Sequence, residues 1–404
     1  MSHLFLRGSH CGFLPAFVVA AASFLPLVDA RTWNDSRGRP FEAELVRVDG
    51  ANVILTLPNG RSFSMPQSDL SAADRAFLSG KGGGTAPNAP AVQMTSPATL
   101  NFGRPWPREV RMDGASNCKV ISEDAKTGRY VYESPGYRFT CDARVTDDAL
   151  RNFSVMFETT RKFAQLLPLS LGGGRERNGK LDILLFGTQN AYISAGGSPG
   201  SAGCFVPSKG VVMVPMESLG LVKGGTGYSL DIKKKNDVLV HELAHQLSPN
   251  VYFVPGALGW FSEGLAEYMA ATPYSWGYFS PDAYGNAVKA YVTTAGTAGS
   301  PGRALGTTIH APDLRNFFLM SYGHFSGPNG NFNYGLGLLV THYFFHMEGG
   351  GKAYRMTQFL QGLHQGKHGE EALKPLLGGG DYEKLEKEIS AAWSRLGVQI
   401  QFGR

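Results

Sequence analysis

His241-Glu242-Leu243-Ala244-His245 is the stretch of this 404-residue sequence that decides how its second half folds. Two histidines four residues apart project from the same face of a helix, so both imidazoles can reach one metal ion. The glutamate between them is then placed to take a proton from a water molecule at that ion. The spacing therefore predicts a helix that carries a metal site on one face.

A second stretch with helical spacing, Trp260–Tyr268 (WFSEGLAEY), carries two more carboxylates. Glu263 follows His245 by eighteen residues, which leaves room for a loop and a returning antiparallel helix. A carboxylate there would complete a zinc site of two histidines and one glutamate, with a fourth position open to water. Glu267 lies one helical turn later on the same face, where it can accept the second ring N–H of His241. A solvated helix residue is the alternative for Glu267.

Two simpler interpretations of these residues are disfavoured. Both histidines could lie on an ordinary polar helix face, but two carboxylates follow them at the spacing that a metal site needs. A purely structural zinc site is usually closed by four Cys or His ligands, and no fourth such residue lies nearby in the sequence. The pattern therefore favours a zinc site that is open for chemistry.

The stretch HELAHQL followed by WFSEGLAEY resembles the glutamate-zincin metallopeptidases, the class that contains thermolysin and the aminopeptidases. The resemblance implies an α+β zincin-type catalytic domain with a mixed sheet, the HExxH helix and a helical C-terminal part. It implies Zn²⁺ as the cofactor and a peptide or protein as the substrate. It covers roughly residues 180–404. The site residues that it implies are the zinc ligands His241, His245 and Glu263 and the general base Glu242.

A further match lies at Asn333–Gly337 (NYGLG), which is similar to the Tyr-x-x-Gly segment that opens a helix in the aminopeptidase branch. The resemblance implies that Tyr334 donates a hydrogen bond to the oxyanion of the tetrahedral intermediate, a charge that appears only in the transition state. From the residues alone, Tyr334 could instead be a packing aromatic at a helix start. Tyr322 and His324 are rival donors.

The strand before the predicted metal-binding helix is expected at Gly210–Pro215 (GVVMVP). In the glutamate-zincins such a strand commonly forms the upper wall of the cleft, where an extended substrate pairs by β-addition. By resemblance, this strand takes that role. The amine-recognising Gly-x-Met-Glu-Asn string of the aminopeptidase branch has no counterpart at Met213–Ser218 (MVPMES). That departure favours an endopeptidase over an aminopeptidase.

Two functions from other classes stay open. The chain could be an exported binding or adhesion protein whose zincin domain is catalytically silent. Glu242 argues against this, because a silent site has no chemical need for a base between its ligands. It could also be a zinc hydrolase of a non-peptide substrate, because the choice of a peptide bond rests on resemblance.

The first thirty residues are predicted to be a signal peptide. Arg7 precedes an apolar run over residues 12–28, and small residues end the run at Val28 and Ala30. The run is short for a membrane span and contains two prolines, so a permanent span is disfavoured. The sequence therefore predicts export to the periplasm or the extracellular space. The net charge of +5 is modest for this length and implies no dedicated nucleic-acid surface.

Cysteine usage fits an exported chain. Cys118 and Cys141 flank a segment with strand character, and an oxidising compartment would favour a disulfide between them. Cys204 would then be a free thiol. Another pairing, or three free thiols, stays open because connectivity does not follow from sequence.

Residues 31–78 are predicted to form a small unit of short strands at 41–48, 53–57 and 63–65, with a helical ending at 69–74. Its Trp33, Asn59-Gly60 and Leu70 are similar to positions of the Sla-one homology domain, a small SH3-like β-barrel. The resemblance implies a short peptide ligand, while a spacer or packing role fits the residues equally well. Residues 79–100, rich in Gly and Pro, are predicted to be a flexible linker.

The remaining residues, 101–404, are predicted to form the catalytic domain. A helix is expected from Asp147 to Leu167 and a buried strand from Leu181 to Phe186. Asn236 or Asp237 can cap the metal-binding helix. The C-terminal part should be helical, with breaks at 349–351 and 378–380. Leu385, Ile389 and Trp393 recur there at helical spacing, which predicts a buried face.

Overall fold

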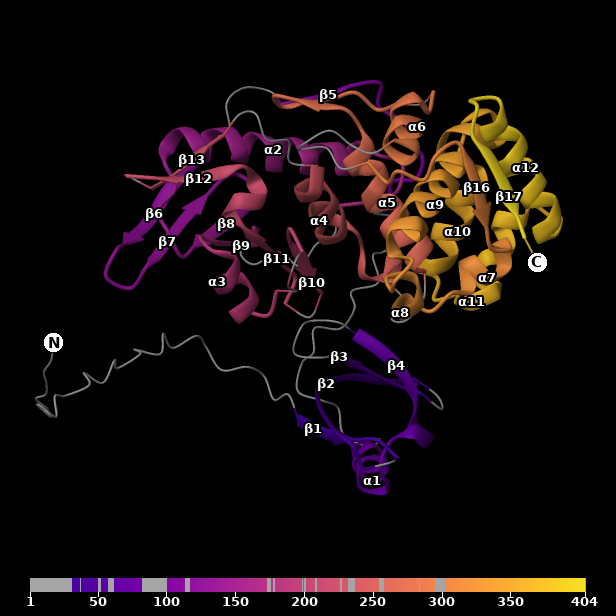
Figure 1. Cartoon of the computed structure of the whole chain (residues 1–404), viewed down its shortest axis with the longest axis horizontal. Helices are drawn as coiled ribbons and strands as arrows, with labels where there is room; N and C mark the ends of the chain where they lie inside the picture. The colour runs from indigo at the N-terminus through magenta and orange to yellow at the C-terminus, as the bar shows by residue number, and fades with distance from the viewer. Residues whose placement is uncertain are drawn as a thin grey trace, which may run out of the picture.

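In Figure 1 a six-stranded sheet and a helical C-terminal part lie on either side of two central helices, α4 and α5. The predicted signal peptide lies outside the described residues, as does most of the predicted linker, so both stay predictions. The computed structural model describes residues 31–36, 38–49, 52–56, 62–81, 100–112, 117–172, 176, 179–197, 199, 201–207, 209–225, 227–231, 237–253, 258–282, 284–294 and 302–403.

The N-terminal unit is a four-stranded antiparallel sheet closed off by a helix. Strands β1 (Arg31–Asn34), β2 (Pro40–Asp49), β3 (Asn52–Thr56) and β4 (Ser62–Pro66) pair in sequence order. The last three confirm the predicted strands, and β1 was not predicted. A short 3-10 turn (Gln67–Asp69) leads to α1 (Ala72–Lys81). Its assignment to the SH3-like barrels stays a prediction.

Helix α1 is longer than the helical ending predicted at 69–74 and runs into the segment assigned to the linker. The packing gives the reason. Leu78 lies in the core of this unit, and the Phe77 ring meets the buried Trp33 ring edge-on at 5.8 Å. The helix must therefore extend past these two residues to cover the sheet.

The six-stranded sheet is mixed and runs in the order β10-β11-β9-β8-β7-β6. Strands β8, β9 and β11 are parallel, and the other pairings are antiparallel. Helix α2 (Asp147–Leu166) makes the crossover from β8 to β9, as a parallel pair requires. The predicted helix and the predicted strand at Leu181–Phe186 are confirmed. The strands are β6 (Lys119–Asp124), β7 (Arg129–Glu133), β8 (Tyr137–Cys141), β9 (Leu181–Phe186), β10 (Cys204–Val206) and β11 (Val211–Pro215).

The strand predicted to line the substrate cleft does not lie at the sheet edge. Strand β11 pairs with β10 on one side and with β9 on the other, and all five of its residues are buried. Both of its hydrogen-bonding edges are therefore occupied over Val211–Met213, so the predicted β-addition to Gly210–Pro215 is wrong for these residues. The edge on this side of the sheet is β10, a strand of only three residues.

The predicted disulfide between Cys118 and Cys141 is absent. Cys118, Cys141 and Cys204 are all free thiols in the structure. Burial raises the pKa of the Cys118 thiol to about 11, and burial likewise raises that of Cys141. Both sulfurs are therefore protonated near neutral pH and are poor nucleophiles for thiol exchange.

Two helices at the centre carry the predicted metal-binding residues. These are α4 (Asp237–Leu247) and the almost wholly buried α5 (Gly259–Ala271). Leu385, Ile389 and Trp393 are buried along α12 (Tyr382–Ser394), as predicted. The other helices are α3 (Gln189–Ser194), α6 (Asn286–Thr293), α7 (Leu314–Leu319), α8 (Tyr322–Phe325), α9 (Gly330–His342), α10 (Tyr354–His364) and α11 (Gly369–Leu373). The other strands are β5 (Val110–Arg111), β12 (Leu221–Gly224), β13 (Gly227–Leu230), β14 (Tyr274–Ser275), β15 (Tyr278–Phe279), β16 (Thr308–Ala311) and β17 (Gln399–Phe402).

Two glycines let α5 and α9 pack backbone against backbone. A Cβ on Gly264 would lie 2.6 Å from the carbonyl oxygen of Gly337, and a Cβ on Gly337 would lie 2.9 Å from the carbonyl oxygen of Trp260. Neither distance is tolerable, because the obstructing atoms are main-chain atoms that cannot swing aside. The close approach brings Tyr334 on α9 up to His241, one of the predicted metal-binding residues.

A search of the described helices for a membrane span found none of sufficient length and apolar character. Asn236, one of the two predicted caps of α4, lies outside the described residues, and nothing is described of the Asp237 side chain.

Candidate metal centre

The side chains of His241, His245 and Glu263 converge on one point between α4 and α5. His241 Nε2 lies 3.1 Å from His245 Nε2 and 3.1 Å from Glu263 Oε2. His245 Nε2 lies 3.3 Å from the same carboxylate oxygen. Within the described part of the chain, this is the one group of three or more such side chains that could hold a metal ion. The structure thus brings together the three residues that the sequence singled out.

The separations of these three atoms suit a zinc ion. Zinc bonds to imidazole nitrogen and carboxylate oxygen measure about 2.0–2.1 Å, so two corners of a tetrahedron lie roughly 3.3 Å apart. The observed distances of 3.1, 3.1 and 3.3 Å are those of three such corners. Two imidazoles and one carboxylate are also a donor set that zinc accepts, with one corner left for water or substrate.

Glu267 fixes which nitrogen of His241 is free to bind a metal. Its Oε1 lies 2.9 Å from His241 Nδ1, so Nδ1 carries a proton and donates it. In the neutral imidazole the lone pair then resides on Nε2, which points at Glu263. Glu267 has no exposed surface, so the alternative of a solvated helix residue is excluded. The predicted contact with His241 is present.

The cluster attracts positive charge. Burial works to lower the pKa of His241, but hydrogen bonds to Glu263 and Glu267 outweigh it and hold that pKa well above its ordinary value. Burial works to raise the pKa of Glu263, yet His245 and His241 hold it well below its usual range. Lone pairs that face one another need a cation between them, either a proton or a metal ion.

Tyr322 positions the third member of the cluster. Its hydroxyl donates to Glu263 Oε1 at 2.8 Å, which leaves Oε2 as the oxygen that faces both histidines. His324, the other rival donor, is exposed, and its Nδ1 contacts the Ser321 hydroxyl at 2.9 Å. The structure thus places Tyr322 at the site as a partner of Glu263, whereas the described contact of His324 is with Ser321.

Glu242 points at the edge strand β10. Its Oε2 accepts a hydrogen bond of 2.8 Å from the main-chain N–H of Phe205. Phe205 is the middle residue of β10 and stands opposite Val212 of β11. Because this N–H is directed to Glu242, the outer edge of β10 faces α4. The bond also fixes one carboxylate oxygen and orients the group.

Tyr334 lies against the site with its ring in an aromatic stack. The ring is nearly parallel to that of His241, with centroids 6.2 Å apart, and to that of Phe325, at 5.6 Å. The negative charge of Glu263, followed by burial, raises the pKa of Tyr334 above its ordinary value. The hydroxyl therefore stays protonated and can donate. The ring packs against His241 and Phe325, as the simpler interpretation expects.

Arg303 is a part of the site that the sequence did not reveal. Its Nε donates to Glu267 Oε2 at 2.8 Å, and its Nη2 donates to Glu267 Oε1. It lies thirty-six residues beyond Glu267, in the irregular segment before β16. No motif or periodicity marks that segment, so only the folded chain could identify the residue.

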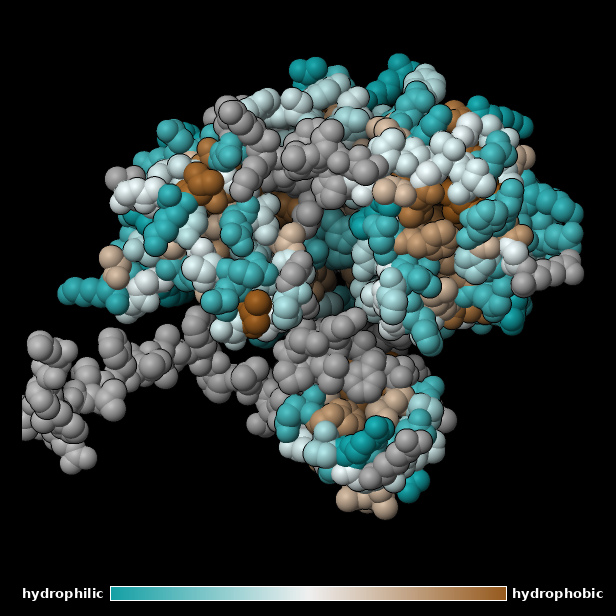
Figure 2. Space-filling model, viewed as in Figure 1, coloured by the Kyte–Doolittle hydropathy of each residue, from teal (hydrophilic) through white to brown (hydrophobic). Residues whose placement is uncertain are grey.

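Aromatic side chains flank the cluster on the side of His245. The Phe253 ring lies 5.5 Å from the His245 ring and 6.0 Å from the Phe205 ring, centroid to centroid. Both phenylalanines are partly exposed. The face seen in Figure 2 is hollowed between the part that carries the six-stranded sheet and the helical part, where α4 and α5 lie. An apolar wall therefore adjoins the candidate metal centre.

Helix α4, which carries both histidines of the candidate metal centre, is anchored directly on the sheet. The Gln246 side chain, next to His245 in sequence, donates to the main-chain oxygens of Asp182 at 3.0 Å and Gly210 at 3.1 Å. These residues lie at the starts of β9 and β11. The last turn of α4, which carries His245, is thereby fixed relative to the sheet.

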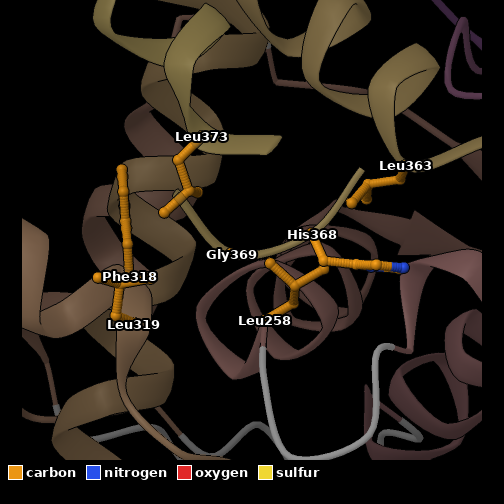
Figure 3. A pocket seen from close by; sticks show the side chains of 7 residues that line it. All are labelled: Leu258, Phe318, Leu319, Leu363, His368, Gly369 and Leu373. Carbon is orange, nitrogen blue, oxygen red and sulfur yellow. The ribbon is translucent and has the colours of Figure 1, made fainter. Parts of the chain in front are cut away.

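A small apolar pocket elsewhere in the helical part is separate from this site. Figure 3 shows that its lining comes from α7, α10, α11 and the residue before α5. It shares no lining residue with the candidate metal centre. The lining residues are Leu258, Phe318, Leu319, Leu363, His368, Gly369 and Leu373.

The comparisons with known proteins supply no family for this chain. Neither the scan against protein-family models nor the search of the curated proteins found a match. What the site does must therefore follow from its own residues.

Proposed function

We propose that this chain is a zinc-dependent metallopeptidase that cuts within peptide chains. The observation that carries the proposal is the convergence of His241 Nε2, His245 Nε2 and Glu263 Oε2 at 3.1–3.3 Å, with Glu242 on the same helix beside them. A zinc site that catalyses hydrolysis usually has three protein ligands, and here a carboxylate that can act as the base lies nearby. The predicted signal peptide adds that the enzyme is exported.

Zinc, when bound, would polarise the scissile carbonyl and make water acidic enough to attack it near neutral pH. Glu242 takes the proton of the attacking water on a carboxylate oxygen and returns it to the leaving amine. The Phe205 N–H holds the other oxygen in place during both transfers. Tyr334 donates from its protonated hydroxyl to the developing oxyanion.

The edge strand supports cleavage within a chain. The outer edge of β10 faces Glu242, so an extended peptide that lies across the candidate metal centre would run beside this edge, while the Phe205 N–H stays on Glu242. A peptide bound in this way requires no free terminus. The partly exposed Phe205 and Phe253 would favour an apolar side chain next to that bond.

The decisive experiment is proteolysis of an unfolded protein by the full exported chain. We expect internal fragments, complete loss of cleavage with a zinc chelator, and recovery when zinc is added back. A chain that binds zinc but cuts no peptide would overturn the peptidase assignment. That outcome would favour a hydrolase of another substrate, or a binding protein with a silent site.

Tyr334→Phe removes only the proposed oxyanion donor, since the ring that packs between His241 and Phe325 is kept. We expect kcat to fall by about 10²–10³-fold with little change in KM or zinc content, because the lost bond forms only in the transition state. Steady-state kinetics on a peptide substrate would measure this.

Tyr322→Phe is the matched comparison, because its hydroxyl donates to Glu263 at 2.8 Å. It should weaken zinc binding more than it lowers the kcat of the zinc-saturated enzyme. If Tyr322→Phe caused the large loss of kcat and Tyr334→Phe caused none, the oxyanion donor would be Tyr322 instead.

A further inference from the structure

The main chain at Arg303 is fixed by hydrogen bonds that do not involve the site. Main-chain N–H groups of residues 303–306 donate to the carbonyl oxygens of residues 291–294 at the end of α6, over distances of 2.7–3.2 Å. The Asn331 side chain on α9 donates to the Arg303 carbonyl oxygen at 2.8 Å. The guanidinium is thus presented by a segment that is hydrogen-bonded to two helices.

The edge of the guanidinium holds Glu267. Both oxygens of that carboxylate accept from Arg303, and Oε1 also faces His241 Nδ1 at 2.9 Å. The Glu267 side chain is 1% exposed and that of Arg303 21%. A carboxylate buried this deeply needs a charged partner with good geometry, and the planar fork of arginine matches both of its oxygens at once. The pair therefore leaves Glu267 one orientation from which to bind His241.

The same guanidinium also lies over the Tyr334 ring. The Arg303 Cζ atom lies 5.1 Å from the centroid of the Tyr334 ring and 5.9 Å from that of Tyr291. A cation within about 6 Å of a ring centroid is attracted to the electron-rich face of the ring. Tyr334 therefore lies over Arg303 as well as in its stack with His241.

We propose that Arg303 is a positioning residue of the metal centre, which fixes Glu267 through its two donors and Tyr334 through the charge that lies over the ring. One side chain thereby orients both the His241 ring and the oxyanion donor. The part concerning zinc binding depends only on the cluster being a metal site. The part concerning Tyr334 rests on the proposed function.

The test compares Arg303→Met and Arg303→Lys with wild type in the full chain. Zinc affinity is measured by competition with a chromophoric chelator, and kcat is measured at saturating zinc. Arg303→Met loses the charge, the fork and the flat face, so we expect about tenfold weaker zinc binding and a kcat lowered by roughly tenfold. Arg303→Lys keeps the charge alone and should recover part of the zinc affinity and little of the kcat.

Arg355→Met is the matched control. Arg355 is 19% exposed, about as buried as Arg303, and it binds Glu348 and Glu388 at 3.1 and 2.7 Å in a different part of the helical region. It should lower the melting temperature as Arg303→Met does and leave zinc affinity unchanged.

The proposal is overturned if Arg303→Met binds zinc as tightly as wild type, or if Arg355→Met weakens zinc binding equally. A wild-type chain that binds no zinc would overturn it as well. The two proposals can also fail separately. If wild type binds zinc and Arg303→Met binds it less tightly, but neither cuts a peptide, Arg303 remains a positioning residue and the peptidase function is removed.

Discussion

Glu242→Gln is expected to lower kcat for peptide hydrolysis by about 10²–10⁴-fold while zinc content stays at the wild-type value. The amide has the size of the carboxylate, but it cannot take a proton from water at neutral pH. Its oxygen can still accept from the Phe205 N–H, which now bonds Glu242 Oε2 at 2.8 Å, so the side chain should keep its place. The lower kcat would therefore result from the lost proton transfer and not from a displaced helix.

Metal analysis and steady-state kinetics on the same preparation would test this prediction. Glu371→Gln, at an exposed position on the remote α11, is the matched control and should behave as wild type. Full activity in Glu242→Gln would remove Glu242 as the general base. Loss of zinc together with activity would show that the substitution disturbed His241 and His245, the two ligands that lie on the same helix.

The sequence could predict the centre of this site because its spacing is local. His241 and His245 are one turn apart on α4, and Glu263 and Glu267 are one turn apart on α5, so helical geometry alone puts each pair on one face. The resemblance of WFSEGLAEY to the glutamate-zincins then implied which carboxylates belong to the site. The structure brings all four side chains into contact.

The remaining parts depend on contacts between segments that are distant in sequence. Arg303 reaches Glu267 across thirty-six residues, and Tyr322 reaches Glu263 across fifty-nine. Neither lies on a periodic element, since α8 has four residues and Arg303 lies in no helix or strand. Hydrophobic periodicity carries no information on such pairs. The sequence offered Tyr322 only as a rival donor.

The error at Gly210–Pro215 has a related cause. A continuous apolar run predicts a buried strand, and β11 is one, but burial on both faces does not reveal which neighbours the strand pairs with. The edge strand β10 is three residues long and gives no pattern of its own. Sheet order, and with it the strand that faces Glu242, follows only from the folded chain.

Glu263→Ala is expected to reduce bound zinc from one ion per chain to nearly none at micromolar zinc, and peptide hydrolysis should disappear with it. Two imidazoles remain, but the carboxylate oxygen that now lies 3.1 and 3.3 Å from them is gone. The negative charge that balances the cation is lost as well, so affinity should fall by far more than from any change outside the ligand set.

Glu267→Ala is the comparison for Glu263→Ala, because Glu267 contacts His241 Nδ1 and not the nitrogen that faces the metal position. It should weaken zinc binding by roughly 10–100-fold yet still reach one ion per chain when zinc is in excess. The two variants are measured by metal analysis after dialysis and by chelator competition. An unchanged zinc content in Glu263→Ala would take Glu263 out of the ligand set. In that case the hydrogen bond of 2.8 Å from the Tyr322 hydroxyl to Glu263 in the wild-type protein would be an ordinary buried hydrogen bond that does not position a metal ligand.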